Sequence, residues 1–135
     1  EGWARYTEAL AEEMNLYTTE ASLILRRTWN YRGMVVDPGL HLYKWNKEKV
    51  IDYIMESGGS YNSALSLYYR IIATPGQLTS YDVGATEIFK FREIAESKLS
   101  TSFDLKEFHE LILKNGSIPL TALEKEFELW LRDQK

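Results

Sequence analysis

The chain contains no cysteine, and only two of its 135 residues are histidine. Without thiols it forms no disulfide, no cysteine nucleophile and no cysteine-ligated zinc site. The two histidines, His41 and His109, are far apart in the sequence, and their spacing does not support a self-contained zinc site of two histidines and one carboxylate. No H-E-x-x-H, G-x-S-x-G or phosphate-cradling glycine motif occurs. Taken alone, these residues define no catalytic centre.

Long apolar runs and blocks of basic residues are also missing. The longest apolar runs, such as residues 23–25, are far shorter than the roughly 18 to 20 residues of a membrane-spanning helix, so we expect no membrane span. The 16 basic and 20 acidic residues are interleaved and give a net charge of −4, which is not the basic footprint expected for nucleic-acid binding. The chain shows no signal peptide pattern, and its composition does not decide the compartment.

What the sequence does contain is typical of a folded helical protein. Hydrophobic residues make up 44% and charged residues 27%, which are ordinary values for a globular protein, and the length fits one domain. The apolar residues recur at helical spacing, with no convincing β-alternation. We therefore predict an all-α, multi-helix single domain over residues 1–135. The predicted helices run approximately over residues 3–16, 19–36, 46–58, 60–74, 77–99, 104–115 and from 119 onward.

Short polar residues, proline and glycine predict where these helices begin and end. Asn46 is the expected N-cap of the third helix, and Asp104 with Glu107 reads as a capping box. The second helix is expected to end before residues 37–39 (DPG), because the residue before proline avoids the helical region and glycine can close a helix. His41 is then expected to lie in a loop, which Asp37 would cap or orient.

Four blocks of sequence, in order along the chain, match one pattern. They read EGWARYTE at residues 1–8, VDPGLHLYKW at 36–45, PGQLTSYDVG at 75–84, and FDLKEFH followed by G-x-x-P-L within 103–120. They resemble the E-G-W-A-L-Y-x-E, V-D-x-G-x-H-x-x-x-W, P-G-Q-x-x-S-Y-x-x-G and F-D-L-x-x-F-H … G-x-x-P-L blocks of the bacterial domain of unknown function 885. Each block alone is a weak signal, but the four together span nearly the whole chain.

The resemblance implies a zinc-dependent reaction. Members of that family resemble gluzincin-type zinc peptidases, in which an H-E-x-x-H helix supplies two zinc ligands and a general base, and a downstream glutamate supplies the third ligand. By this resemblance Glu1 is the third zinc ligand. The chain is then the C-terminal helical portion of a larger zincin-like peptidase fold, and zinc is held only in the full-length protein. The alternative is that Glu1 is merely a charged residue, since one carboxylate does not hold zinc.

Two further residues have an expected catalytic role from the resemblance. Tyr81 would donate a hydrogen bond to the oxyanion that forms when water attacks a carbonyl. His41 would bind substrate or stabilise the same oxyanion. The alternatives are a core tyrosine and a structural histidine.

Arg70, Gln77 and Trp45 are the expected substrate-binding residues. Arg70 could hold a substrate carboxylate in a bidentate pair, or form a structural ion pair. Its surroundings depart from the family pattern, which usually reads E-R-Y where this chain reads YRI at residues 69–71. For His109, in the first turns of a predicted amphipathic helix, we expect a structural role.

Two functions are therefore carried forward. The first is a segment of a zinc peptidase, whose partners are a peptide substrate and the upstream part of the same polypeptide. The second is a non-catalytic helical interaction or scaffold module that keeps the family fold, because a fold does not determine a function. If partner segments are missing, exposed apolar faces would favour self-association.

Overall fold

The computed structural model describes residues 1–28 and 31–134. Within these residues the chain is all-α, as predicted, and no strand occurs. No helix in this part of the chain is long and apolar enough to cross a membrane. The helices are, in order, α1 Gly2–Glu13, α2 Glu20–Thr28, α3 Tyr31–His41, α4 Lys47–Glu56, α5 Tyr61–Ala73, α6 Gln77–Leu99, the 3₁₀ helix η1 Ser100–Ser102, α7 Leu105–Leu113 and α8 Leu120–Asp133.

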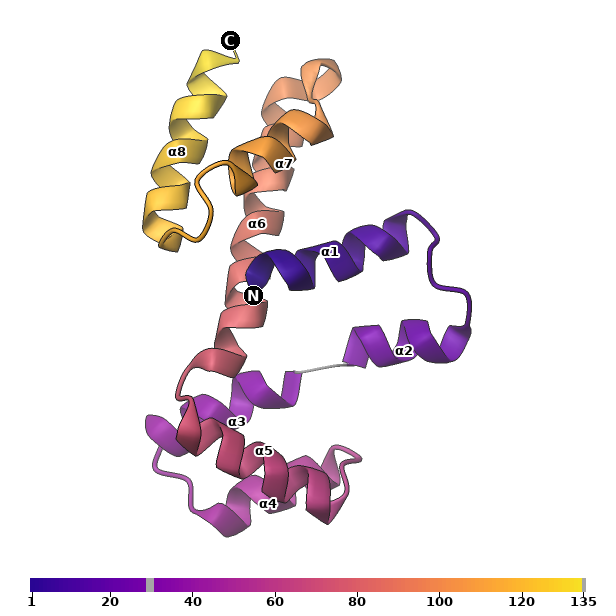
Figure 1. Cartoon of the computed structure of the whole chain (residues 1–135), viewed down its shortest axis with the longest axis vertical. Helices are drawn as coiled ribbons and strands as arrows, with labels where there is room; N and C mark the ends of the chain where they lie inside the picture. The colour runs from indigo at the N-terminus through magenta and orange to yellow at the C-terminus, as the bar shows by residue number, and fades with distance from the viewer. Residues whose placement is uncertain (29–30, 135) are drawn as a thin grey trace.

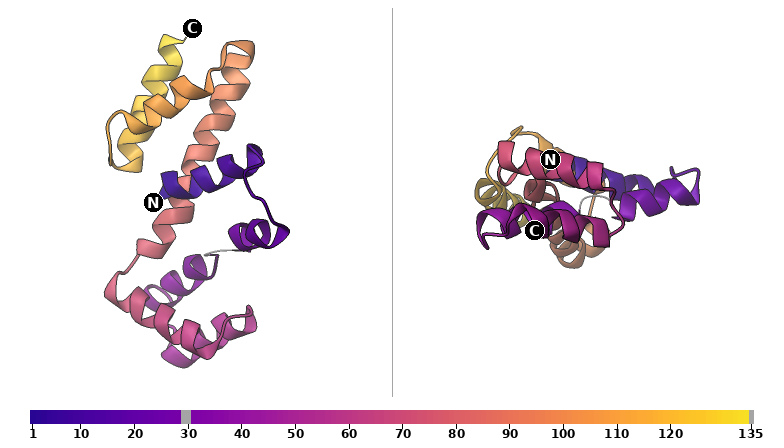
Figure 2. Two further views of the ribbon diagram at one scale, coloured as in Figure 1. Left: turned by 45° about the vertical axis from the view of Figure 1, so that its right-hand side comes forward. Right: turned by 90° about the horizontal axis from the view of Figure 1, so that it is seen from below.

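The long helix α6 is the spine of the molecule (Figure 1). At one end of α6 lie α3, α4 and α5, and at the other end α7 and α8. Helix α1 crosses the middle of α6, as Figure 1 and the left view of Figure 2 show. Segments from the beginning, middle and end of the sequence are therefore held together through α6.

Two apolar clusters lie along this spine. The first joins α1, α6, α7 and α8, and its buried residues are Tyr6, Ile88, Phe91, Ala95, Phe108, Leu111, Ile112, Leu123, Phe127 and Leu131. The second joins α3, α4, α5 and the start of α6, and its buried residues are Val36, Val50, Ile51, Ile54, Ala64, Ile71 and Leu78. Helix α6 contributes to both clusters, so it fixes the position of one relative to the other.

The predicted caps are present at the helix starts. Asn46 accepts a hydrogen bond from the Lys49 N–H at 2.9 Å, and this satisfies one of the free donors in the first turn of α4. The Asp104 carboxylate accepts from the N–H groups of Lys106 and Glu107, at 2.7 and 3.1 Å. The prediction of α6 from residue 77 to residue 99 is also confirmed.

The predicted helix over residues 19–36 is wrong at its C-terminal end. Residues 29 and 30 lie outside the described residues, but α3 continues through Pro38 and ends at His41. A proline inside a helix costs about 3 kcal/mol. Here tertiary contacts offset that cost: Val36 is fully buried in the second cluster, and the buried Asp37 is bonded to the start of α6. The packing therefore overrides the local stop signal.

Candidate functional site

Glu1 is brought to the start of α6 by a close crossing of two helices. Gly2 and Gly84 touch where α1 meets α6, and a Cβ atom added to Gly2 would lie 2.5 Å from the backbone of Gly84. Only glycine permits such an approach of two backbones. A buried ion pair fixes the same crossing, because the Arg5 Nε donates to the Asp82 Oδ1 at 3.2 Å. Glu1, directly before Gly2, therefore lies over the first turns of α6.

Four of the residues singled out in the sequence form one polar network here. The Gln77 side-chain amide donates to the Glu1 Oε1 at 2.7 Å and to the Tyr81 hydroxyl at 3.2 Å. The Arg70 Nη2 donates to the Gln77 Oε1 at 2.8 Å. The structure thus joins Glu1, Arg70, Gln77 and Tyr81, which come from three separate segments of the sequence.

The turn that carries Gln77 is held by a carboxylate from α3. Asp37 is 3% exposed, and its Oδ2 and Oδ1 accept from the Gly76 N–H at 2.9 and 3.2 Å. Gly76 has a φ of +79°, in the left-handed region that glycine adopts without strain. Asp37 therefore ties α3 to the start of α6, rather than capping a loop beside its own helix.

His41 and Trp45 lie outside this network. His41 is the last residue of α3 rather than a loop residue, and its Nε2 lies 3.2 Å from the Ile71 carbonyl oxygen and 3.7 Å from the Asp37 Oδ1. The Trp45 ring covers Gly39 and packs on the second cluster, with the Lys49 Nζ 4.3 Å from its centroid. Their contact with substrate stays a prediction.

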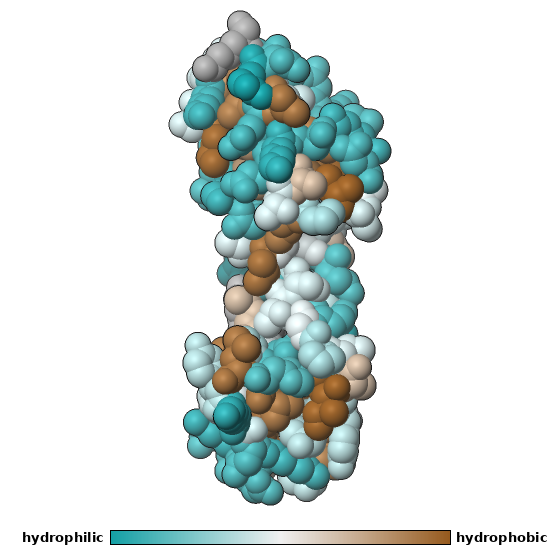
Figure 3. All heavy atoms as spheres, turned by 90° about the vertical axis from the view of Figure 1, so that its left-hand side faces the viewer, coloured by the Kyte–Doolittle hydropathy of each residue, from teal (hydrophilic) through white to brown (hydrophobic). Residues whose placement is uncertain are grey.

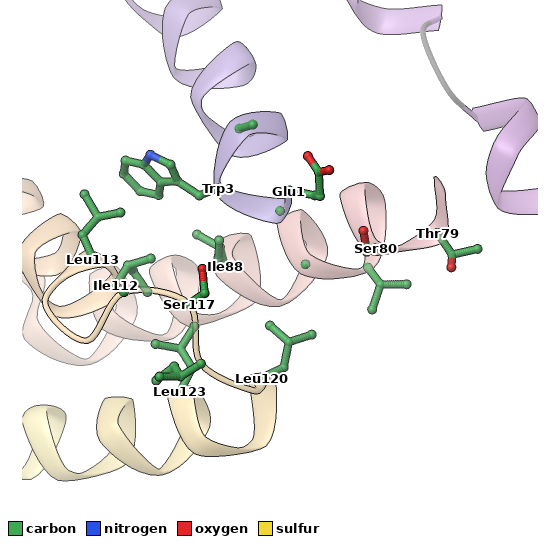
Figure 4. A pocket seen from close by; sticks show the side chains of 16 residues that line it. Glu1, Trp3, Thr79, Ser80, Ile88, Ile112, Leu113, Ser117, Leu120 and Leu123 are labelled. Carbon is green, nitrogen blue, oxygen red and sulfur yellow. The ribbon is translucent and has the colours of Figure 1, made fainter. Parts of the chain in front are cut away.

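An apolar groove of about 720 Å³ opens next to Glu1. Its walls come from the start of α1, from α6, and from the connection between α7 and α8. Trp3, Ile88 and Leu113 are among the residues that line it. Glu1 lies at its edge, with the carboxylate directed away from Leu120 and Leu123 (Figure 4). The space-filling view shows apolar surface at the narrow middle of the molecule, between two wider ends (Figure 3).

The family model described as "bacterial protein of unknown function (DUF885)" matches residues 1–127. The chain belongs to this family. No curated protein matches this DUF885 chain. Among solved structures, it is similar to "the putative lipoprotein from Colwellia psychrerythraea", with 34% identity and a TM-score of 0.87. The similarity covers 98% of this chain but only 24% of that protein, so the chain spans about a quarter of the length of its relative.

No group of three or more histidine, aspartate or glutamate side chains is placed to hold a metal within the described residues. Glu1 nevertheless fits the role of a single ligand. Its Oε1 accepts from Gln77, whereas its Oε2 makes no hydrogen bond or ion pair to the part of the chain that the structure describes. A catalytic zinc site needs about three protein ligands, so the others would have to come from elsewhere.

His109 contacts the side chains of α1. The Tyr6 hydroxyl oxygen lies 2.9 Å from the His109 Nε2, and the Trp3 ring meets the imidazole edge-on, with centroids 5.2 Å apart. Arg92 donates to the same hydroxyl at 3.2 Å. Burial raises the pKa of Tyr6, and burial together with the charge of Arg92 lowers the pKa of His109. These groups anchor α7 to α1.

Two contacts that determine the geometry of this site do not follow from the sequence blocks. The contact between Gly2 and Gly84 joins the block at residues 1–8 to the block at residues 75–84. The only hint of it in the sequence is that each block contains a glycine. The partner of Asp37, Gly76, is 39 residues away in the sequence, and no local pattern identifies it.

Proposed function

We propose that this chain is the segment of a zinc-dependent peptidase that supplies the third metal ligand, Glu1, and an oxyanion donor, Tyr81. The two histidine ligands and the general base would come from an H-E-x-x-H helix in another part of a longer polypeptide. When bound, zinc would activate a water molecule for attack on a peptide carbonyl. The proposal thus assigns two roles implied by the resemblance to gluzincin peptidases to Glu1 and Tyr81.

The observation that carries the proposal is the arrangement of the Glu1 carboxylate. One oxygen is held by a neutral amide at 2.7 Å, and the other is left without a partner among the described residues. Metal-binding carboxylates are characteristically held in this way by hydrogen bonds from neighbouring groups. A purely structural glutamate at an exposed position would gain little from such a fixed orientation.

The Tyr81 hydroxyl supports the same reading. It accepts a hydrogen bond from the Gln77 amide, so its own hydrogen is available for another acceptor. A donor next to a metal-bound carbonyl stabilises the negative charge that develops on the oxygen. Tyr81 and Glu1 are both joined to the same amide nitrogen, so they face the same region of the molecule.

The proposal is tested in the longer protein that contains this chain. We expect the wild-type protein to bind about one zinc ion and to hydrolyse members of a mixed peptide library. Glu1→Ala and Glu1→Gln should lose both properties. The matched control is Glu128→Ala, an exposed glutamate on α8, which packs at the other end of α6 from α5. Retained zinc and retained hydrolysis in the Glu1 variants would exclude Glu1 as a ligand.

A second candidate is the helical scaffold module without catalysis. It is favoured by the absence of a complete ligand set in the described residues and by the exposed apolar groove, which suits a packing partner. The sequence outside this chain discriminates between the two candidates. If the longer protein lacks H-E-x-x-H and binds no zinc, the scaffold function is the better account.

A further inference from the structure

The direction of each hydrogen bond around Gln77 follows from the chemistry of its neighbours. A guanidinium only donates hydrogen bonds, so the Gln77 amide oxygen must face Arg70. The amide nitrogen then faces the other way, toward Glu1 and Tyr81. A carboxylate only accepts, which requires the same orientation independently. The two charged neighbours therefore agree on a single orientation of the amide.

Both hydrogens of the amide nitrogen are used. One is donated to the Glu1 Oε1 at 2.7 Å, and the other to the Tyr81 oxygen at 3.2 Å. What remains is one carboxylate oxygen on Glu1 and one hydroxyl hydrogen on Tyr81. These are the atoms that a metal ion and a developing oxyanion would require.

The amide also separates two opposite charges. Arg70 acts on Glu1 through Gln77, and no direct ion pair between Arg70 and Glu1 occurs among the described residues. A guanidinium placed directly on the carboxylate would form a bidentate pair and occupy both oxygens. With a neutral amide in between, the Glu1 carboxylate keeps its charge and one open oxygen for a cation.

The backbone of Gln77 is fixed as firmly as its side chain. Gln77 is the first residue of α6, and the residue before it, Gly76, donates its N–H to the buried Asp37 carboxylate. Tyr81 lies one helical turn further on, so the same turn sets the position of both residues. Asp37 and Arg70 thus act on Gln77 from α3 and α5.

We infer that Gln77, oriented by Arg70, is a positioning residue that holds Glu1 and Tyr81 so that one carboxylate oxygen and one hydroxyl hydrogen face the reacting centre. This inference rests on the proposed function. It differs from the expectation drawn from the sequence, in which Gln77 and Arg70 contact the substrate themselves. The two roles make different predictions for metal affinity.

The test measures zinc affinity in the longer protein by competition with a chelator. We expect Gln77→Met to weaken zinc binding by roughly 10- to 100-fold, as is usual when a group that orients a ligand is removed. Arg70→Met should also weaken it, because the Gln77 amide oxygen then loses the donor that holds the side chain in place. The control is Gln134→Met, which makes the same change at the other glutamine of the chain, exposed at the end of α8. Melting curves of the metal-free variants should match that of the wild type.

The outcomes separate this inference from the proposed function. If Glu1→Ala abolishes zinc binding but Gln77→Met binds zinc as the wild type does, the inference is overturned and the proposed function stands. If Gln77→Met raises KM with zinc affinity unchanged, Gln77 contacts substrate and the inference is also overturned. If Glu1→Ala leaves zinc affinity unchanged, both are rejected. Loss of zinc affinity in the Gln77 and Arg70 variants, with kcat lowered and KM unchanged at saturating zinc, supports the inference.

Discussion

At the scale of single residues, two arginines set the direction of two hydrogen-bond chains. Arg70 fixes the Gln77 amide, and Arg92 fixes the Tyr6 hydroxyl. Because a guanidinium only donates hydrogen bonds, the Gln77 amide oxygen and the Tyr6 hydroxyl oxygen must accept. The hydrogens of the Gln77 amide and of the Tyr6 hydroxyl are then available for other acceptors. The sequence blocks identified Gln77, but they did not identify this ordering, because it depends on side chains that meet only in the folded chain.

The second chain of hydrogen bonds predicts a pH effect on stability. Arg92 donates to the Tyr6 oxygen, which lies 2.9 Å from the His109 Nε2, so a proton added to the imidazole would lie close to the charge of Arg92. Burial and the charge of Arg92 lower the His109 pKa below its ordinary value of 6.5. The folded state therefore binds this proton less tightly than the unfolded chain, and the free energy of unfolding decreases as the pH falls through about 6.5 toward the lower folded pKa.

We expect His109→Gln to flatten this part of the stability curve. Urea denaturation from about pH 8 to about pH 5 would measure it, since glutamine can accept from Tyr6 but does not titrate. The control is His41→Gln, at the other histidine of the chain. An unchanged slope in His109→Gln, or a flattened slope only in His41→Gln, would show that His109 is not the group responsible.

At the scale of helices, the sequence predicts a helix boundary correctly where the boundary depends only on nearby residues. Asn46 and Asp104 start their helices as predicted, because a cap is satisfied by residues two or three positions away. The stop signal at Pro38 fails, because the end of α3 is decided by its packing on α4 and α6. Helix starts could thus be read from the sequence, whereas the position of His41 could not.

The bond between Asp37 and Gly76 gives a prediction at this scale. We expect Asp37→Ala to lower the free energy of unfolding by about 1 to 3 kcal/mol, because it leaves the Gly76 N–H without its acceptor. Asp37→Asn keeps an acceptor and should recover part of the loss. Urea denaturation compares both with Asp52→Ala, an exposed aspartate on α4. If Asp37→Ala and Asp52→Ala are equally stable, the bond does not hold α3 to α6.

At the scale of the whole molecule, the arrangement is two apolar clusters joined by one helix. The sequence predicted the helices and their apolar faces, but not which faces meet, because that pairing joins residues up to about a hundred positions apart, such as Tyr6 and His109. The groove beside Glu1 lies where the start of α1 meets α6 (Figure 4). Its apolar lining costs free energy while it faces water.

This groove leads us to expect that the 135-residue chain on its own self-associates. Val83 and Leu113 are 46% and 47% exposed and line the groove, so a second copy that covers them would remove apolar surface from water. Light scattering coupled to size-exclusion chromatography, over a range of protein concentrations, should show a mass that rises above 15.7 kDa. Leu113→Ser should shift the equilibrium toward the monomer.

The matched control is Leu129→Ser on α8, because Leu129 is 48% exposed but does not line the groove. Both variants remove the same apolar side chain from surfaces of similar exposure, so a general change in solubility affects them alike. If association occurs through the groove, only Leu113→Ser reduces the measured mass. A chain that stays monomeric at all concentrations, or two variants that behave identically, would show that the groove is not the surface through which copies meet.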